Sequence, residues 1–90
     1  MKPDAVLREA ESCFGIKGEE IRRRGQKYTD ARYVASFSLR RHCLMSLRVI
    51  GERVGLHYSA VGNAIGQVRD RPTASQTSAL RALEEKITNR

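Results

Sequence analysis

The sequence predicts an all-α domain of about six short helices, and three observations support this. Apolar residues recur at the i, i+3, i+4 and i+7 spacing of an amphipathic helix in several segments, and no segment alternates with the two-residue period of a strand. Glycine, proline and capping residues separate these segments. Ninety residues, 40% of them hydrophobic, suffice for one modest core, since domains typically span about 50–200 residues. We therefore expect one helical domain over residues 1–90.

The N-terminal part of the chain predicts two short helical segments. Residues 3–14 place their apolar side chains on one helical stripe, and Gly15 suits the position just past the end of a helix. A single helical turn is expected at 18–23. A basic connection over 22–28 follows it and leads to the longest helix.

Two further helices are expected from apolar spacing together with capping residues. The longer one is predicted at 30–44, with Thr29 as its N-cap, because apolar residues keep the core spacing over three turns. The last helix is predicted at about 75–88, with Ser75 or Thr73 as its cap. No internal repeat or low-complexity segment interrupts this pattern.

The most informative pattern is a pair of helices that meet at a glycine. Ser46 suits the N-cap of a helix at 47–54, and Gly55 can adopt the left-handed conformation that ends this helix sharply. A second helix is expected at 58–69, with His57 at its N-cap. Two helices joined by a three- or four-residue turn that contains glycine define a helix-turn-helix, so we predict this motif here.

The second helix of this motif carries polar and small side chains on its outer face. Ser, Asn and Gln side chains hydrogen-bond base edges or phosphates, a small Ala can approach a thymine methyl, and free N–H groups at a helix N-terminus favour a phosphate. Gly62 and Gly66 each weaken the helix by about 0.5–1 kcal/mol relative to Ala, which suits close approach of the backbone to DNA or to a neighbouring helix. The outward residues are Tyr58, Ser59, Ala60, Asn63 and Gln67.

The net charge of +7 is concentrated in the middle of the chain. Residues 21–72 hold eleven basic and three acidic side chains, whereas residues 1–20 hold three basic and five acidic ones. A pI near 10.1 is typical of a small nucleic-acid-binding domain, for which a pI above about 9 is usual. A solvated surface, or attraction to an anionic membrane, is the alternative interpretation of this charge.

The residues that could carry catalysis or bind a metal lack useful spacing. Cys13 and Cys43 lie 30 residues apart without a CxxC pair, and His42 and His57 share no ligand spacing with them. We therefore expect two buried cysteines in a reducing cytosol, no metal, no cofactor and no enzymatic activity. No apolar run approaches the roughly 18–20 residues that a membrane span requires.

Several short motifs, in this order, resemble the C-terminal DNA-binding domain of DnaA, the bacterial chromosomal replication initiator. They are Phe-Gly-Ile at 14–16, Glu-Ile at 20–21, Ala-Arg-Tyr-Val-Ala at 31–35, Leu-Arg at 39–40, and the Ser-Leu and Ile-Gly pairs within 46–51. The resemblance implies a Trp repressor-like helical domain of about six helices that binds duplex DNA with the second helix of the motif in the major groove. It also implies that a basic loop, here residues 22–27, reaches phosphates or the adjacent minor groove.

The entry to the second helix departs from that family. The family carries Asp-His-Thr-Thr where this chain has His-Tyr-Ser-Ala at 57–60, and one residue is missing at the turn after Gly55. The Tyr-Ser-Ala-Val run is more similar to the DnaA-like domains of transposases associated with repetitive elements (REP-associated transposases). No Walker loop is present, so ATP hydrolysis would need further domains of a longer protein.

The motif, the charge and the resemblance together predict sequence-specific binding to double-stranded DNA. The domain would target a transposase or a replication-initiator-like protein to DNA in the bacterial cytoplasm, in association with the nucleoid. We expect neither a small-molecule substrate nor a membrane partner. A basic helical protein-interaction module without DNA readout is the alternative. The predicted DNA-binding residues are Arg22, Arg23, Arg24, Lys27, Ser46, His57, Tyr58, Ser59, Ala60, Asn63 and Gln67.

Overall fold

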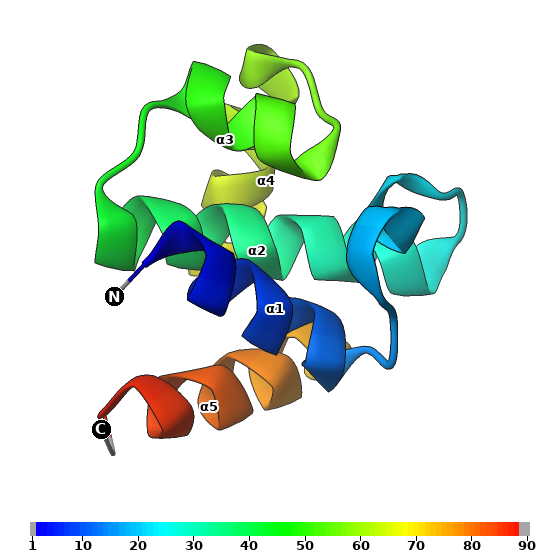
Figure 1. Cartoon of the computed structure of the whole chain (residues 1–90), viewed down its shortest axis with the longest axis vertical. Helices are drawn as coiled ribbons and strands as arrows, with labels where there is room; N and C mark the ends of the chain where they lie inside the picture. The colour runs from blue at the N-terminus through cyan, green and yellow to red at the C-terminus, as the bar shows by residue number, and fades with distance from the viewer. Residues whose placement is uncertain (1, 89–90) are drawn as a thin grey trace.

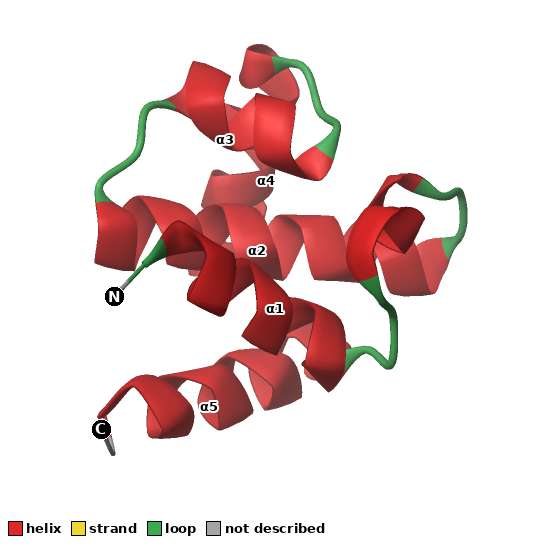
Figure 2. Cartoon of the chain, viewed as in Figure 1, coloured by secondary structure: helices red, strands yellow, loops and turns green. Residues whose placement is uncertain are grey.

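The computed structural model describes residues 2–88, and within them every regular element is a helix (Figure 2). The all-α prediction is confirmed, whereas the expected count of about six helices is slightly too high. Residues 2–88 form five α-helices and one single-turn 3₁₀ helix. These elements are α1 (Pro3–Cys13), η1 (Gly18–Arg22), α2 (Gln26–Cys43), α3 (Leu47–Val54), α4 (Tyr58–Asp70) and α5 (Ala74–Thr88).

The long helix α2 is the centre of the fold and contacts every other element (Figure 1). Helices α1 and α5 pack together along one side of α2. Helices α3 and α4 pack together on the other side, and the first turn of α4 lies at the end of the molecule remote from α5. This arrangement leaves the start of α4 free of contact with the α1–α5 layer.

The core forms where the apolar faces of these helices meet around α2. Burying one Val, Leu or Ile side chain stabilises a fold by about 1.5–3 kcal/mol, so this set dominates the favourable energy. Leu83 of α5 is fully buried, while Leu80 and Ile87 are half-buried. The apolar side chains with no exposed surface are Val6, Ala10, Ala31, Val34, Ala35, Leu39, Ile50, Val54, Val61, Ala64 and Leu83.

Helix α2 begins four residues earlier than predicted, so Thr29 is not its N-cap. Gly25 occupies that position with φ of 129°, and the Thr29 N–H donates to the Gly25 carbonyl within the first turn (3.0 Å). The next residue, Asp30, is buried, and its carboxylate accepts hydrogen bonds from the amides of Gln26 and Gln76 (3.1 Å each). The basic connection is therefore reduced to the short segment between η1 and α2.

The other predicted caps are confirmed. The Ser46 hydroxyl accepts the backbone N–H three residues further on (3.3 Å), and Gly55 ends α3 in the left-handed conformation (φ 80°). His57 accepts an N–H at the start of α4 through Nδ1 (3.3 Å). Of the two candidates for α5, Thr73 is the cap, since its hydroxyl accepts the backbone N–H three residues on (3.1 Å). Each of these contacts satisfies a backbone N–H that the helix itself leaves unpaired.

The prediction of two buried cysteines is wrong. Cys13 is exposed, and its thiol donates to the Ala79 carbonyl at 3.7 Å, while Cys43 is half-buried. Cys43 packs against the core from its edge, whereas Cys13 lies outside it. Within residues 2–88, no helix combines the length and the apolar character that crossing a membrane would require.

Candidate nucleic-acid interface

Helices α3 and α4 meet at a tight junction that depends on Gly51. A Cβ atom at this position would lie 2.3 Å from the backbone oxygen of Leu56, so any larger residue would collide with the turn. The N–H groups of Gly55 and Leu56 both donate to the Gly51 carbonyl, at 2.8 and 3.0 Å. The nearest neighbour of Gly51 is therefore the turn, while the second helix lies farther away, with Val61 Cγ2 at 3.5 Å from the Cβ position.

Three consecutive residues form a compact polar cluster at the start of α4. The His57 and Tyr58 rings lie 4.4 Å apart between centroids, and the Ser59 hydroxyl is 2.8 Å from Nδ1 of His57. The Ser59 backbone N–H donates to Nδ1, so this nitrogen is the acceptor of the helix cap. All three side chains are exposed, so the cluster presents donors and an aromatic surface to solvent.

Arg48 joins this cluster from the first turn of α3, and sequence reasoning missed it. Its guanidinium lies 5.0 Å from the centroid of the Tyr58 ring, a cation–π distance that restrains an otherwise flexible side chain. Both residues line a shallow groove of about 350 Å³ at the α3–α4 turn. Helical spacing contained the signal, because Arg48 precedes Gly51 by three residues and Gly55 by seven, on the face next to the turn.

Arg22 lines the same groove but is partly committed to the fold. Its guanidinium donates to the Glu52 carbonyl at the end of α3 (2.5 Å), where a cation is favoured by the helix dipole. Its stem passes over the turn, since a Cβ on Gly55 would lie 2.9 Å from Arg22 Cγ. Through this hydrogen bond Arg22 connects η1 to the end of α3.

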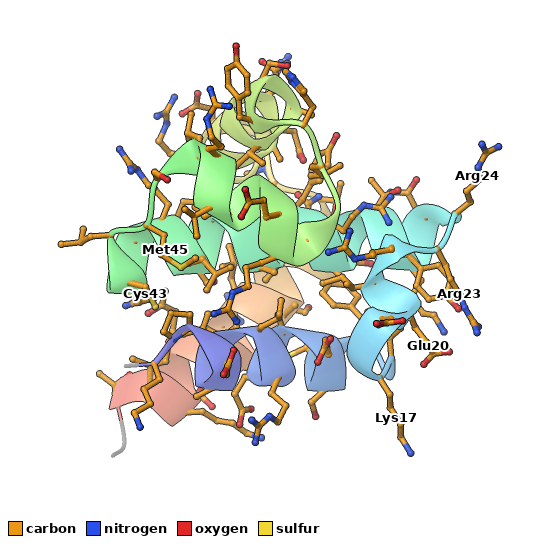
Figure 3. All side chains as sticks on the ribbon, turned by 45° about the horizontal axis from the view of Figure 1, so that its top comes forward. Lys17, Glu20, Arg23, Arg24, Cys43 and Met45 are labelled. Carbon is orange, nitrogen blue, oxygen red and sulfur yellow. The ribbon has the colours of Figure 1, made fainter. Side chains whose placement is uncertain are left out.

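The remaining basic residues of the predicted loop differ in their surroundings. Arg23 forms an ion pair with Glu20 at 3.0 Å, and the Nζ of Lys27 lies 5.0 Å from the Tyr28 ring. Figure 3 shows Arg24 extending away from the ribbon, and no acidic side chain of residues 2–88 pairs with it. Arg24 is therefore the cation of this loop that has no side-chain partner among residues 2–88.

The structure separates the other predicted contact residues. Asn63 is exposed on α4, one turn after Ser59, whereas Ala60 is half-buried. Gln67 is turned toward α5, where its amide exchanges hydrogen bonds with that of Gln76 (3.0 Å) and donates to the Arg71 carbonyl. Ser46 lies at the opposite end of α3 from the turn, with its hydroxyl in the cap. The start of α4 therefore brings together Arg22, His57, Tyr58, Ser59 and the newly found Arg48.

Gly62 and Gly66 leave the middle of the exposed α4 face without side chains. A Cβ on Gly62 would make ordinary contact with Leu47 at 3.6 Å, and one on Gly66 would meet nothing closer than the Arg69 guanidinium at 3.9 Å. No neighbouring helix requires either glycine. Their presence leaves the helix backbone accessible to a partner from outside.

Gly66→Ala is therefore expected to stabilise the fold. Replacing a mid-helix glycine in open space gains about 0.5–1 kcal/mol, which raises the melting temperature of a domain this size by about 2–8 °C. Thermal unfolding followed by circular dichroism measures this. A lower melting temperature would show that the chain packs more tightly around Gly66 than its surroundings indicate.

No protein-family model matches this chain, and a search of curated proteins finds no significant similarity. Among residues 2–88, no group of three or more His, Cys, Asp or Glu side chains is placed to hold a metal ion. The charge and geometry of the α3–α4 region are therefore the features that point to a function.

Proposed function

We propose that this chain binds double-stranded DNA sequence-specifically through a helix-turn-helix formed by α3 and α4. The observation that carries the proposal is the start of α4, where an aromatic and polar cluster, two arginines and an exposed helix end lie together. A helix of 13 residues with one exposed, sparsely substituted face fits a major groove about 12 Å wide. The net charge of +7 supports attraction to phosphates.

Each part of the cluster has a distinct role in this proposal. Arg48, held against Tyr58, contacts a phosphate at the edge of the groove, and the free N–H groups of the first α4 turn favour a second phosphate. Asn63 projects from the exposed face and reads a base edge, since an Asn amide pairs with adenine through two hydrogen bonds. Arg24 adds a phosphate contact from the neighbouring loop.

The proposal includes the kind of longer protein to which this DNA-binding domain would belong. The resemblance to the DNA-binding domain of DnaA, and to DnaA-like domains of transposases, supports a role as the DNA-targeting part of a longer bacterial protein associated with the nucleoid. We expect less than about tenfold preference for the replication-initiator box over a scrambled duplex, since each altered reader costs about 1–3 kcal/mol. Two readers differ, because His57 and Tyr58 replace the family's Asp-His pair. Fluorescence anisotropy at matched salt measures the ratio of the two affinities. A hundredfold preference for the box would contradict this expectation and indicate an initiator-like specificity.

A second candidate function is a basic protein-interaction module, and one observation favours it. Leu44 adopts the left-handed conformation (φ 52°) while its side chain is 82% exposed, and Val49 nearby in the sequence is 43% exposed. A large apolar residue in this conformation is uncommon and is found preferentially at functional positions. A protein partner would explain these two residues, whereas the basic start of α4 favours DNA.

Arg48→Ala distinguishes the two functions. Under the DNA proposal it weakens binding to all duplexes alike and reduces the steepness of the log–log salt dependence by about 0.9, the value of one phosphate contact. An electrophoretic shift assay with random-sequence duplex at several salt concentrations measures both. Arg8→Ala, which removes an exposed arginine of α1, is the matched control. Equal salt dependence in both variants and the intact chain would contradict the role of Arg48.

A further inference from the structure

A second basic groove lies at the other end of α4, between α2, α4 and α5. It encloses about 540 Å³ and is open to solvent. One exposed arginine comes from each of the three helices, namely Arg41 from α2, Arg69 from α4 and Arg81 from α5. No predicted contact residue lies in it, so it is separate from the cluster at the start of α4.

The floor of this groove is apolar and holds one of the arginines in place. Phe37, Val68 and Leu80 line it, and the Arg41 guanidinium lies 6.0 Å from the centroid of the Phe37 ring. This contact with the ring favours an Arg41 position within the groove rather than free in solvent. The groove is therefore a shaped cationic surface.

Two of the three arginines keep their full positive charge for a partner. Arg69 donates two hydrogen bonds to Asp70 (2.9 and 3.0 Å), and this bonding lowers the pKa of Asp70, so the pair is neutral overall. Glu84 is the one acid that lines the groove, and its Oε1 lies 3.0 Å from Nε2 of His42, within hydrogen-bond distance. No acidic side chain of residues 2–88 forms an ion pair with Arg41 or Arg81.

The position of the groove relative to α4 identifies its partner. Arg69 follows Tyr58 by eleven residues, a distance of about 16 Å along a helix that rises 1.5 Å per residue. That length is enough to span a major groove about 12 Å wide from one phosphate wall to the other. Between these ends the exposed face of α4 carries Asn63 and the two glycines, Gly62 and Gly66, and at its far end the Arg69 guanidinium lies near Gly66.

The geometry points to a second phosphate site: Arg41 and Arg81 hold the DNA strand opposite to the strand that Arg48 contacts. This inference depends on the proposed function and specifies how α4 lies, namely across the major groove rather than end-on. Gly62 and Gly66 then lie over the base edges, where the backbone must approach closely. The groove takes the sugar–phosphate backbone of the same duplex, with the deoxyribose against the apolar floor.

The salt dependence of duplex binding by Arg41→Ala/Arg81→Ala tests this site. Two lost phosphate contacts reduce the log–log slope by about 1.8, so the affinity loss between 50 and 200 mM salt becomes about twelvefold smaller than in the intact chain. Fluorescence anisotropy with a random-sequence duplex measures the slope. Lys2→Ala/Arg8→Ala removes two exposed cations, one just before α1 and one within it, and is the charge-matched control. We expect it to change the slope by less than one phosphate contact would. The double variant Arg41→Lys/Arg81→Lys is expected to keep the salt slope of the intact chain, because both positive charges are retained.

Hydroxyl-radical footprinting supplies the second readout, on a duplex that the intact chain selects from random sequences. We expect Arg41→Ala/Arg81→Ala to lose protection on one strand only, with the protection near Arg48 retained. A slope equal to that of the control double variant, or a footprint unchanged on both strands, would overturn the second site while leaving the proposed function intact. Absence of any salt-dependent duplex binding by the intact chain would instead refute the proposed function itself, and the second site with it.

Discussion

Gly51→Ala is expected to lower the free energy of unfolding by about 3 kcal/mol. The added Cβ would lie 2.3 Å from the Leu56 carbonyl oxygen, and the turn that carries this oxygen is fixed by two hydrogen bonds to Gly51 itself. Backbone cannot move aside as a flexible side chain can. The melting temperature should therefore fall by about 12–24 °C, as measured by circular dichroism.

Gly66→Ala is the matched control for this experiment, because it makes the same substitution in open space on the neighbouring helix. The two variants should shift the melting temperature in opposite directions. Unchanged stability of Gly51→Ala would show that α3 and α4 adjust easily at their junction. Such a junction would not hold the exposed face of α4 in a fixed orientation.

Asn63→Ala is expected to remove sequence preference while leaving general affinity for DNA unchanged. Its amide is exposed on α4, one turn after the polar cluster, and a bidentate contact to a base is worth about 1–3 kcal/mol. The affinity for the preferred site should fall about 5- to 150-fold, with no change on random duplex. The preferred site is first obtained by selection from random duplex sequences with the intact chain.

Competition between the selected and random duplexes gives both affinities in one experiment. Because the Asn63 side chain is exposed and forms no hydrogen bond with another residue of 2–88, its truncation should leave the melting temperature unchanged, which serves as the control for folding. Equal weakening on both duplexes would assign Asn63 to the phosphate backbone. The orientation of α4 derived above would then be wrong.

The helices around the α3–α4 junction were predictable because local residues define their ends. Ser46, Gly55 and His57 each act within a few residues of their own position, through a cap or a left-handed turn. The start of α2 was not predictable in this way. Asp30 is buried inside the helix because the Gln76 amide, 46 residues away, hydrogen-bonds its carboxylate. A contact at that separation leaves no local pattern, so Thr29 resembled a cap.

The same distinction holds for the candidate site. Exposure of Ser59 and Asn63 followed from helical spacing, because one face of α4 packs on α2 and α3. Gln67 was predicted to face outward, but its amide bonds to Gln76 of α5. Arg22 was predicted to contact DNA, and its guanidinium also hydrogen-bonds the Glu52 carbonyl at the end of α3. Both depend on neighbours that only the folded chain supplies.

Under both proposals this chain binds duplex DNA through phosphate contacts at the two ends of α4. The most direct test of this binding is the affinity of the intact chain for a random-sequence duplex, measured by fluorescence anisotropy from 50 to 200 mM salt. Contacts from Arg24, Arg48, Arg41 and Arg81 predict a log–log slope of about −3.6, at about 0.9 per phosphate. A slope near zero, or no binding at the lowest salt, would contradict both proposals and favour a protein partner for the basic surface.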